Sequence, residues 1–159
     1  MNIKIICLGK IKEQSLASLI DEYKKRISKY ANLEIIELAD EAIPSNPSEK
    51  EILNIKKLEA NKIKSKLNSS DFVICLDQYG KTLTSEEFAE KIQDITLKGF
   101  SSIAFIIGGT TGLDRELVAN SNFTLSFSKL TFPHQLIRLF LTEQIFRAFK
   151  IQNNERYHW

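Results

Sequence analysis

The sequence predicts an α/β fold in which a mostly parallel β-sheet lies between helices. Five short segments rich in Ile and Val alternate with five longer segments whose apolar residues recur three and four positions apart. Some of the short segments, such as AFII and FVIC, are apolar at consecutive positions, which is typical of strands covered on both faces. The 159 residues match the usual size of one domain, so we expect residues 1–159 to form a single domain.

The first half of the chain contains two of the expected strand–helix pairs. The strand IKIICLG (3–9) precedes a helical pattern over 14–30, and LEIIELA (33–39) precedes one over 48–68. Ser48 stands before EKE, which is a typical helix start. The intervening EAIPSNPSEK holds two of the three prolines, and we interpret it as a surface loop inside the domain because neither flank alone could close a core.

The second half of the chain contains the other three pairs. Thr84 and Ser85 stand before two glutamates, and Pro133 is expected in the first turn of the last helix, where its missing amide hydrogen has no cost. The expected strands are 71–76, 102–109 and 123–128, and the expected helices are 85–98, 113–120 and 133–153.

Composition narrows the class of protein. Hydrophobic residues make up 43% and charged residues 26%, which is globular composition, and the net charge of +2 means that any acidic partner needs a local basic patch. Cys7 and Cys75 lie in apolar segments, as buried reduced thiols do, although a disulfide or redox pair stays open. We find no secretory signal, no membrane span and no metal-ligand spacing, and expect a cytoplasmic protein that needs no metal.

Three polar loops are expected at one edge of the sheet. Ligands of open parallel sheets collect outside the carboxyl ends of the strands. There the sequence places LDQYGK (76–81), GGTTGL (108–113) and FSKLTF (127–132), each directly after a strand. The glycines of GGTTG permit close approach of a ligand to the main chain, but a plain turn before a helix would also explain them. Together the three loops favour a small-molecule site made largely of backbone groups.

The last helix is apolar on nearly all sides. Between Leu136 and Ile151 the apolar residues do not share one stripe, so the helix is expected to be buried on more than one side. In a chain of this size a second subunit explains such burial most easily, and we predict a homodimer with this helix at the interface. Glu143 and Arg147 are spaced for an ion pair within the helix, which we interpret as structural.

The chain has two histidines, a residue type whose unperturbed pKa lies near neutral pH. His134 could simply be a first-turn residue. His158 lies in the tail NNERYHW, where the aromatic rings of Tyr157 and Trp159 and the guanidinium of Arg156 suit stacking on an unpaired base. A terminus packed on a neighbouring element would show the same residues.

These segments together resemble one enzyme family. FIIGGTTGL, LSFSKLTFPHQLIR, EQIFRAFKI and the closing YH resemble the ribosomal RNA large subunit methyltransferase H (RlmH) family of the SPOUT superfamily. The resemblance extends to CLGKIKE, EYKKRISKY and LDQYGKTLTSEEFA, and so covers essentially the whole chain. The GG-x-x-G and S-x-T-x-P-H patterns are its most specific parts.

The resemblance implies a function. Members of the family transfer a methyl group from S-adenosylmethionine to N3 of a pseudouridine in 23S rRNA, and are homodimers with a C-terminal trefoil knot. The modest net charge favours rRNA within the assembled ribosome as the acceptor, while the sequence leaves free RNA, a subunit and a whole ribosome open. The resemblance also implies a cofactor cleft lined by Leu76, Gly108, Phe127, Ser128, Lys129, Leu130, Thr131 and Phe132.

Chemical roles are also expected for the tail and the last helix. His158 is the leading candidate for the base, next to Tyr157 in the YH tail, and Arg138 or Arg156 would stabilise the anion that forms. RNA contacts are expected from basic residues in loops and at helix ends, whereas 24–26 are interpreted as a solvated helix face. The candidate RNA contacts are Lys10, Lys12, Lys81, Lys129, Arg138 and Arg156.

Two other classes of function fit parts of the sequence. A nucleotide-binding α/β module without catalysis would use the same glycine and basic loops, and would bind RNA without a cofactor. A dinucleotide-dependent oxidoreductase is the other alternative, although its G-x-G-x-x-G fingerprint would follow a strand near the N-terminus. The late position of GGTTG in this chain counts against it.

Overall fold

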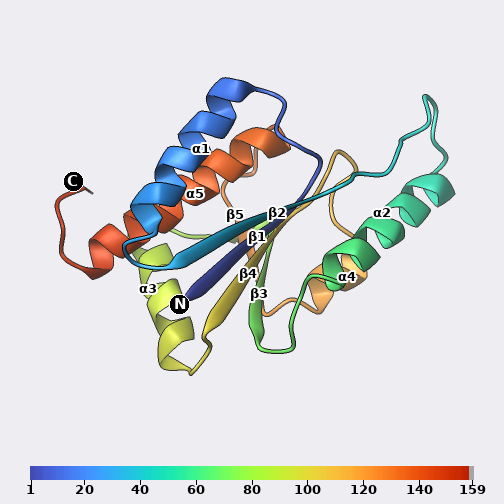
Figure 1. Cartoon of the computed structure of the whole chain (residues 1–159). Coiled ribbons are helices and arrows are strands. Elements are labelled where there is room, and N and C mark those ends of the chain that lie inside the picture. Colours follow the sequence, from blue (N-terminus) through green and yellow to red (C-terminus); the bar gives the residue numbers. More distant parts are fainter. Residues whose placement is uncertain (158–159) are drawn as a thin grey trace.

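Strands and helices alternate along the chain in the predicted order. The computed structural model describes residues 1–157, in which ten elements alternate (Figure 1). The strands are β1 (Asn2–Leu8), β2 (Asn32–Leu38), β3 (Asp71–Thr82), β4 (Ser102–Ile107) and β5 (Phe123–Ser126). The helices are α1 (Gln14–Ile27), α2 (Glu49–Lys64), α3 (Ser85–Leu97), α4 (Arg115–Ala119) and α5 (His134–Gln152).

The sheet is parallel throughout the described residues, which confirms the predicted α/β class. Its strands lie in the order β2-β1-β4-β3-β5, with every neighbouring pair parallel. The carboxyl ends of the strands therefore share one edge, where the loops before α4 and α5 and the end of β3 come together. That edge is where a ligand site is expected in such a sheet.

Helices cover both faces of the sheet. Figure 1 shows α1, α3 and α5 on one face and α2 and α4 on the other. Strand β4 contributes side chains to the cores on both sides of the sheet, because alternate residues project to opposite faces. Phe105 packs into the core under α1, α3 and α5, while its neighbours Ala104 and Ile106 pack into the core under α2 and α4. All six residues of β4 are buried, which explains the unbroken apolar run over 103–107.

Two of the three predicted helix starts are confirmed. Ser48 and Thr84 each form a capping box, in which the cap side chain accepts from the amide of the third helical residue and the glutamate there returns the bond. Pro133 instead occupies the N-cap of α5, outside the helix, because its ψ of 129° is extended. The fixed φ of proline suits both positions, so the residue type alone does not decide between them.

Strand β3 extends beyond its predicted end. LDQYGK was expected to leave the sheet as a loop, but β3 continues to Thr82 with a register shift between Leu76 and Lys81 along β5. Gly80 makes this pairing possible, since a Cβ on it would lie 2.7 Å from the Leu125 carbonyl carbon and from the Thr124 oxygen. This close backbone approach depends on β5, which is more than 40 residues away in the sequence.

Helix α5 lies between α1 and α3 and packs against both. Its apolar surroundings are thus supplied largely by its own chain, which explains most of the burial that the sequence led us to assign to a second subunit. Phe140 is still 42% exposed. The homodimer stays a prediction that rests on this exposed part. Within residues 1–157 no helix is long and apolar enough to cross a membrane.

Candidate functional site

A cavity of about 330 Å³ opens at the carboxyl edge of the sheet, and we call it the loop pocket. It brings together the three segments that the sequence placed at this edge, with His134 and Ile137 from the start of α5. The lining residues are Leu76, Asp77, Gln78, Ile107, Gly108, Gly109, Thr110, Thr111, Gly112, Leu113, Leu125, Ser126, Phe127, Ser128, Leu130, Thr131, Phe132, His134 and Ile137.

Most of the predicted cofactor residues line this pocket. Lys129 is the exception, because it lies in the same loop but is exposed and does not line the cavity. The seven that line it are Leu76, Gly108, Phe127, Ser128, Leu130, Thr131 and Phe132. The geometry thus groups these residues, and their role in cofactor binding stays a prediction.

The glycine loop is shaped by the lack of side chains. A Cβ on Gly108 would lie 3.1 Å from both Cγ and the amide nitrogen of Leu113, closer than ordinary contact. Gly112 has a φ of +77°, which favours glycine, and its amide donates to the Gly109 carbonyl at 3.0 Å. The turn is therefore tight, and it leaves main-chain groups at the pocket wall.

The loop between β5 and α5 is tied to the end of β3. The Ser126 hydroxyl lies within hydrogen-bond distance of the carbonyl oxygens of Gln78 (3.2 Å) and Ser128 (3.0 Å). The Ser128 hydroxyl accepts from the amide of Leu130 at 3.0 Å. These bonds hold two walls of the loop pocket together.

His134 stands at the pocket wall and close to the end of β1. A Cβ placed on Gly9 would lie 3.7 Å from His134 Nε2 and 3.8 Å from Asp40 Oδ2, so imidazole and carboxylate face the same small space. Burial lowers the pKa of His134, the nearby Arg138 lowers it further, and Asp40 opposes them. The imidazole is therefore mostly neutral at pH 7. His134 lines the pocket and is also the first residue of α5.

Arg138 is not exposed, which corrects the expectation that it contacts RNA. Its side chain is fully buried one turn after His134. Nη1 donates to Glu37 Oε1 at 2.8 Å, and Nη2 donates to the carbonyls of Leu8 (2.6 Å) and Gly9 (2.7 Å). The guanidinium satisfies the carboxyl ends of β1 and β2, so it joins α5 to the sheet and has no surface available for a large ligand.

Tyr157 packs on its own chain, away from the loop pocket. The Tyr157 hydroxyl lies 3.1 Å from Glu143 Oε1 and its ring packs edge-on against Phe146 at 4.9 Å. Burial raises the pKa of Tyr157, as do hydrogen bonds to Tyr23 and Glu143. Glu143 lies nine residues after His134, about 14 Å further along the helix axis. Tyr157 and the predicted cofactor loops are therefore separate within one chain.

The other tail predictions have different outcomes. Arg156 is exposed, as a residue that contacts RNA must be. His158, the candidate base, lies outside the described residues. Arg147 Nη2 and Glu143 Oε1 are 2.6 Å apart, which confirms the predicted ion pair within α5.

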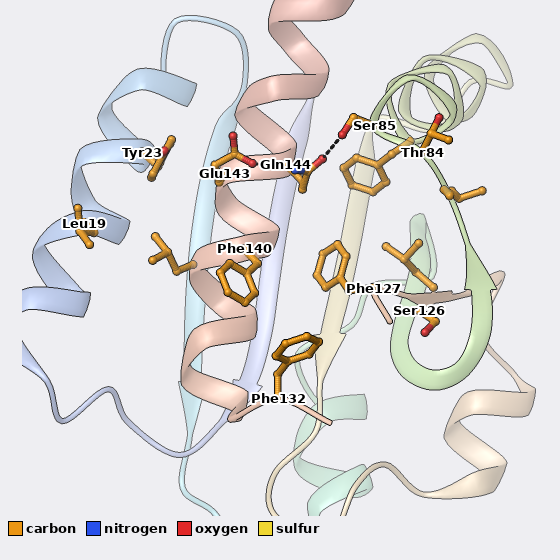
Figure 2. Close-up of a pocket in the computed structure, with 14 residues that line it drawn as sticks. Leu19, Tyr23, Thr84, Ser85, Ser126, Phe127, Phe132, Phe140, Glu143 and Gln144 are labelled. Carbon is orange, nitrogen blue, oxygen red and sulfur yellow. Dashed lines mark hydrogen bonds between the residues drawn. The ribbon is translucent and has the colours of Figure 1, made fainter. Parts of the chain in front are cut away.

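A second cavity adjoins the loop pocket, and sequence reasoning did not find it. This apolar groove, of about 600 Å³, runs along α5 between α1 and α3. Figure 2 shows Phe127, Phe132 and Phe140 around its centre and the 2.9 Å hydrogen bond from Ser85 to Gln144 near one end. The lining residues are Leu19, Tyr23, Leu83, Thr84, Ser85, Phe88, Leu125, Ser126, Phe127, Phe132, Leu139, Phe140, Glu143 and Gln144. The sequence feature that could have indicated the groove is the presence of apolar residues on nearly all sides of α5.

The remaining basic candidates are exposed. Lys10 and Lys12 follow β1, Lys81 lies near the end of β3, and Lys129 lies in the loop between β5 and α5. Residues 24–26 are exposed on α1, and Arg26 pairs with Glu22, as expected of a solvated helix face. Within residues 1–157 no group of three or more His, Cys, Asp or Glu side chains is placed to hold a metal ion.

The two cysteines are free thiols. Cys7 and Cys75 are both buried and form no disulfide, in agreement with the interpretation as small apolar residues. Burial raises the pKa of each thiol to about 11. Neither is therefore ionised near neutral pH, and a nucleophilic role is not supported.

Comparison with known proteins gives consistent results over the whole chain. Residues 1–158 match a family model described as "Predicted SPOUT methyltransferase". The chain is 54% identical to the ribosomal RNA large subunit methyltransferase H of Clostridium novyi and 50% identical to the ribosomal RNA large subunit methyltransferase H 1 of Clostridium perfringens, with 99% of each chain covered.

A solved structure agrees in fold. A probable methylase family protein from Haemophilus influenzae aligns with a TM-score of 0.55 at 16% identity, over 99% of this chain and 70% of that one. At this identity the match shows the fold alone. The family model and the close relatives, which span the full length, decide the assignment, and the chain belongs to the SPOUT methyltransferase family.

Proposed function

We propose that this protein is a cytoplasmic, S-adenosylmethionine-dependent methyltransferase that methylates N3 of a pseudouridine in 23S rRNA. The relatives' names indicate the large-subunit RNA as substrate. The observation that carries the proposal is that one cavity collects seven of the eight residues expected to bind the cofactor. The non-catalytic and oxidoreductase alternatives do not account for the full-length methyltransferase match.

The loop pocket fits the proposed methyl donor. Its volume lies at the lower end of the range for small-molecule sites, and its walls combine apolar side chains with main-chain groups. Leu76, Ile107 and Leu113 would contact the apolar parts of the donor. Because its glycines have no side chains, the main chain of the glycine loop can approach a nucleoside closely.

The proposed chemistry asks little of the protein beyond alignment and proton removal. When bound, S-adenosylmethionine supplies a methyl group on a sulfonium, which is already an activated electrophile. N3 of pseudouridine carries a proton at neutral pH, so attack is assisted by a base that accepts this proton and a cation near the resulting anion. We assign the base to His158 and the cation to Arg156. Tyr157 stays a catalytic candidate through its place in the same tail.

Arg138 has a different role in this proposal. Because its guanidinium is fully buried and bonded to Glu37 and to two carbonyls, we assign it to positioning rather than to contact with the substrate. It holds the start of α5, and with it His134, against the end of β1. A change at Arg138 would thus reach the chemistry through the shape of the loop pocket.

A homodimer with a C-terminal knot completes the proposal. Tyr157 packs beside Glu143 rather than at the loop pocket of its own chain, so the tail would act on the pocket of a partner. The partly exposed apolar side chains of Leu19 and Phe140 along the groove support such a partner. Sedimentation of the intact protein tests this part, and a monomer at working concentration would contradict it.

The central test is methyl transfer. Labelled S-adenosylmethionine is incubated with the protein and either intact ribosomes or naked rRNA from a strain that lacks the protein, and the modified nucleotide is mapped. We expect label at N3 of one pseudouridine, with intact ribosomes as the better substrate. Absence of label in both substrates, with cofactor binding confirmed by a melting shift, would contradict the proposed reaction.

The assignment of the base has its own test. With His158→Ala, we expect the single-turnover methylation rate to fall by about 100- to 10,000-fold, the usual contribution of a general base. The melting shift produced by S-adenosylmethionine should stay unchanged, because His158 is assigned to the acceptor nitrogen and the predicted cofactor residues lie in the loops. An unchanged rate would remove His158 from the chemistry.

A further inference from the structure

An exposed aromatic ring, that of Tyr79, lies next to the lining of the loop pocket. Tyr79 is 89% exposed, the highest exposed fraction of any large apolar side chain in residues 1–157. It directly follows Gln78, which lines the pocket, and Leu130, which also lines the pocket, is 71% exposed. The ring makes no contribution to either core of the sheet. Its position is therefore not explained by the folding of this chain.

The backbone under this ring is held on both sides. The Tyr79 amide donates to Asp77 Oδ1 at 2.9 Å, and the Gln78 carbonyl lies 3.2 Å from the Ser126 hydroxyl. Gly80 lies so close to β5 that a Cβ would collide with its main chain. Lys81 then pairs with Leu125 in the sheet. The turn is anchored to β5, so little backbone ordering is needed when the ring meets a partner.

The charges around the ring favour an anionic partner. Lys81 lies two residues after Tyr79, Lys129 directly precedes the pocket-lining Leu130, and both lysines are exposed. The nearest acidic side chain in the sequence, Asp77, has one oxygen committed to the Tyr79 amide. Exposed aromatics between cations suit single-stranded nucleic acid, whose bases present flat apolar faces and whose phosphates are charged. An apolar protein surface would not require the lysines.

We propose that Tyr79 stacks on an unpaired nucleobase of the RNA substrate and that Lys81 and Lys129 contact the adjoining phosphates. The inference rests on the proposed RNA substrate and adds to it a specific binding surface. The stacked base would lie beside the target nucleotide, at the mouth of the loop pocket. Tyr79 is a binding residue here, and it takes no part in proton or methyl transfer.

The experiment compares Tyr79→Ala, Tyr79→Phe and Leu97→Ala in the full-length protein. Leu97 is a matched control because it is 77% exposed but lies at the end of α3, away from the loop-pocket lining. The affinity for naked 23S rRNA and the KM for ribosomes are measured, together with the melting shift caused by S-adenosylmethionine. Stacking on one base predicts that Tyr79→Ala weakens RNA binding and raises KM by about 5- to 100-fold. Tyr79→Phe and Leu97→Ala should stay within about twofold of the parent protein.

Three results would overturn the inference. One is an unchanged RNA affinity and KM in Tyr79→Ala, and another is an equal loss in Leu97→Ala. The third is a change in the sedimentation coefficient of Tyr79→Ala, which would place the ring in a protein–protein contact instead.

A failure of the proposed function gives a different pattern. If the parent protein transfers no methyl group, the proposed reaction fails regardless of the variants. The RNA affinities still decide the role of Tyr79 in that case, because they do not require turnover. A loss of affinity confined to Tyr79→Ala would then support an RNA-stacking ring on a protein with a different reaction.

Discussion

The loop pocket and the apolar groove share one wall but are constructed differently. Residues 125–127 and Phe132 line both cavities, so the segment between β5 and α5 separates them. The loop pocket is enclosed by loops at the carboxyl ends of strands, where glycines expose main-chain groups. The groove is enclosed by helices α1, α3 and α5, and its surface is made of side chains (Figure 2).

This difference separates the two kinds of recognition that the fold supports. A site walled by loop backbone suits a small molecule of fixed shape, because the main chain and the glycine conformations set its outline. A groove walled by aromatic and aliphatic side chains suits an apolar partner surface, since burial there is not directional. Changes in one cavity should therefore be separable from changes in the other, and four substitutions test this.

Arg138→Met should have the largest effect on stability. The substitution leaves the Leu8 and Gly9 carbonyls without their donor and removes the partner of Glu37. Loss of one partner of a buried pair typically costs about 3–5 kcal/mol of unfolding free energy. Denaturant unfolding measures this, with Arg26→Met on the exposed face of α1 as the control. A loss below about 1 kcal/mol, the value of a surface pair, would show that the buried network contributes little.

Gly108→Ala should act on the loop pocket alone. The new Cβ would lie 3.1 Å from Leu113 and force the glycine loop to shift, so we expect S-adenosylmethionine affinity to fall by roughly 10- to 100-fold. Gly112→Ala is the matched comparison, because its φ of +77° strains the backbone while the space around it is open. It should lower stability by about 1 kcal/mol with a smaller effect on affinity. Calorimetric titration separates the two, and equal affinity losses would argue against a steric limit at Gly108.

Phe140→Ser should act mainly on the groove, because Phe140 lines the groove and does not line the loop pocket. Phe140 is 42% exposed and packs edge-on against Phe132 at 6.0 Å between ring centres. If the groove receives a second subunit, truncation of this ring should weaken the dimer by about 1–3 kcal/mol, which is typical of an aromatic interface residue. Sedimentation over a concentration series measures the dissociation, with Leu97→Ser as the control for surface change. An unchanged dimer would place the interface elsewhere.

Glu59→Gln should have the smallest effect on stability, and it tests a buried carboxyl that lies close to the glycine loop. Glu59 is buried on α2, where Oε1 accepts from the Glu41 amide and lies 3.8 Å from the Cβ position of Gly109. Burial raises the pKa of Glu59, so its stabilising contribution is present at low pH and is lost as pH rises through that pKa. Glutamine stays neutral, and the variant should melt above the parent protein near pH 7, with the gap closing towards about pH 4. A gap that is constant with pH would show that folding does not shift the pKa of Glu59.

Sequence reasoning succeeded where a feature depends on neighbouring residues. The capping boxes at Ser48 and Thr84 lie within four residues of sequence, and the consecutive apolar residues of β4 by themselves indicate a strand covered on both faces. The Glu143–Arg147 pair needs only the helical repeat. The grouping of the three loops followed from a general property of parallel sheets, which needs the order of elements but no side-chain detail.

Sequence reasoning failed where distant segments meet. Arg138 looked like a charged residue near a helix start, yet its partners Glu37, Leu8 and Gly9 are 101 to 130 positions away. The groove likewise needs α1, α3 and α5 together, and the apolar pattern of α5 was assigned to a second subunit because the contribution of α1 and α3 could not be known.

The sequence by itself determined the alternation of strands and helices, the parallel sheet, the glycine loop and membership of the SPOUT family, because each is recorded in local periodicity or in a contiguous motif. Only the tertiary structure decided that β3 runs on through Gly80 against β5, that Arg138 is buried, and that the tail containing Tyr157 packs away from the loop pocket. These outcomes depend on desolvation and close backbone approach between segments far apart in the chain, which no local pattern encodes.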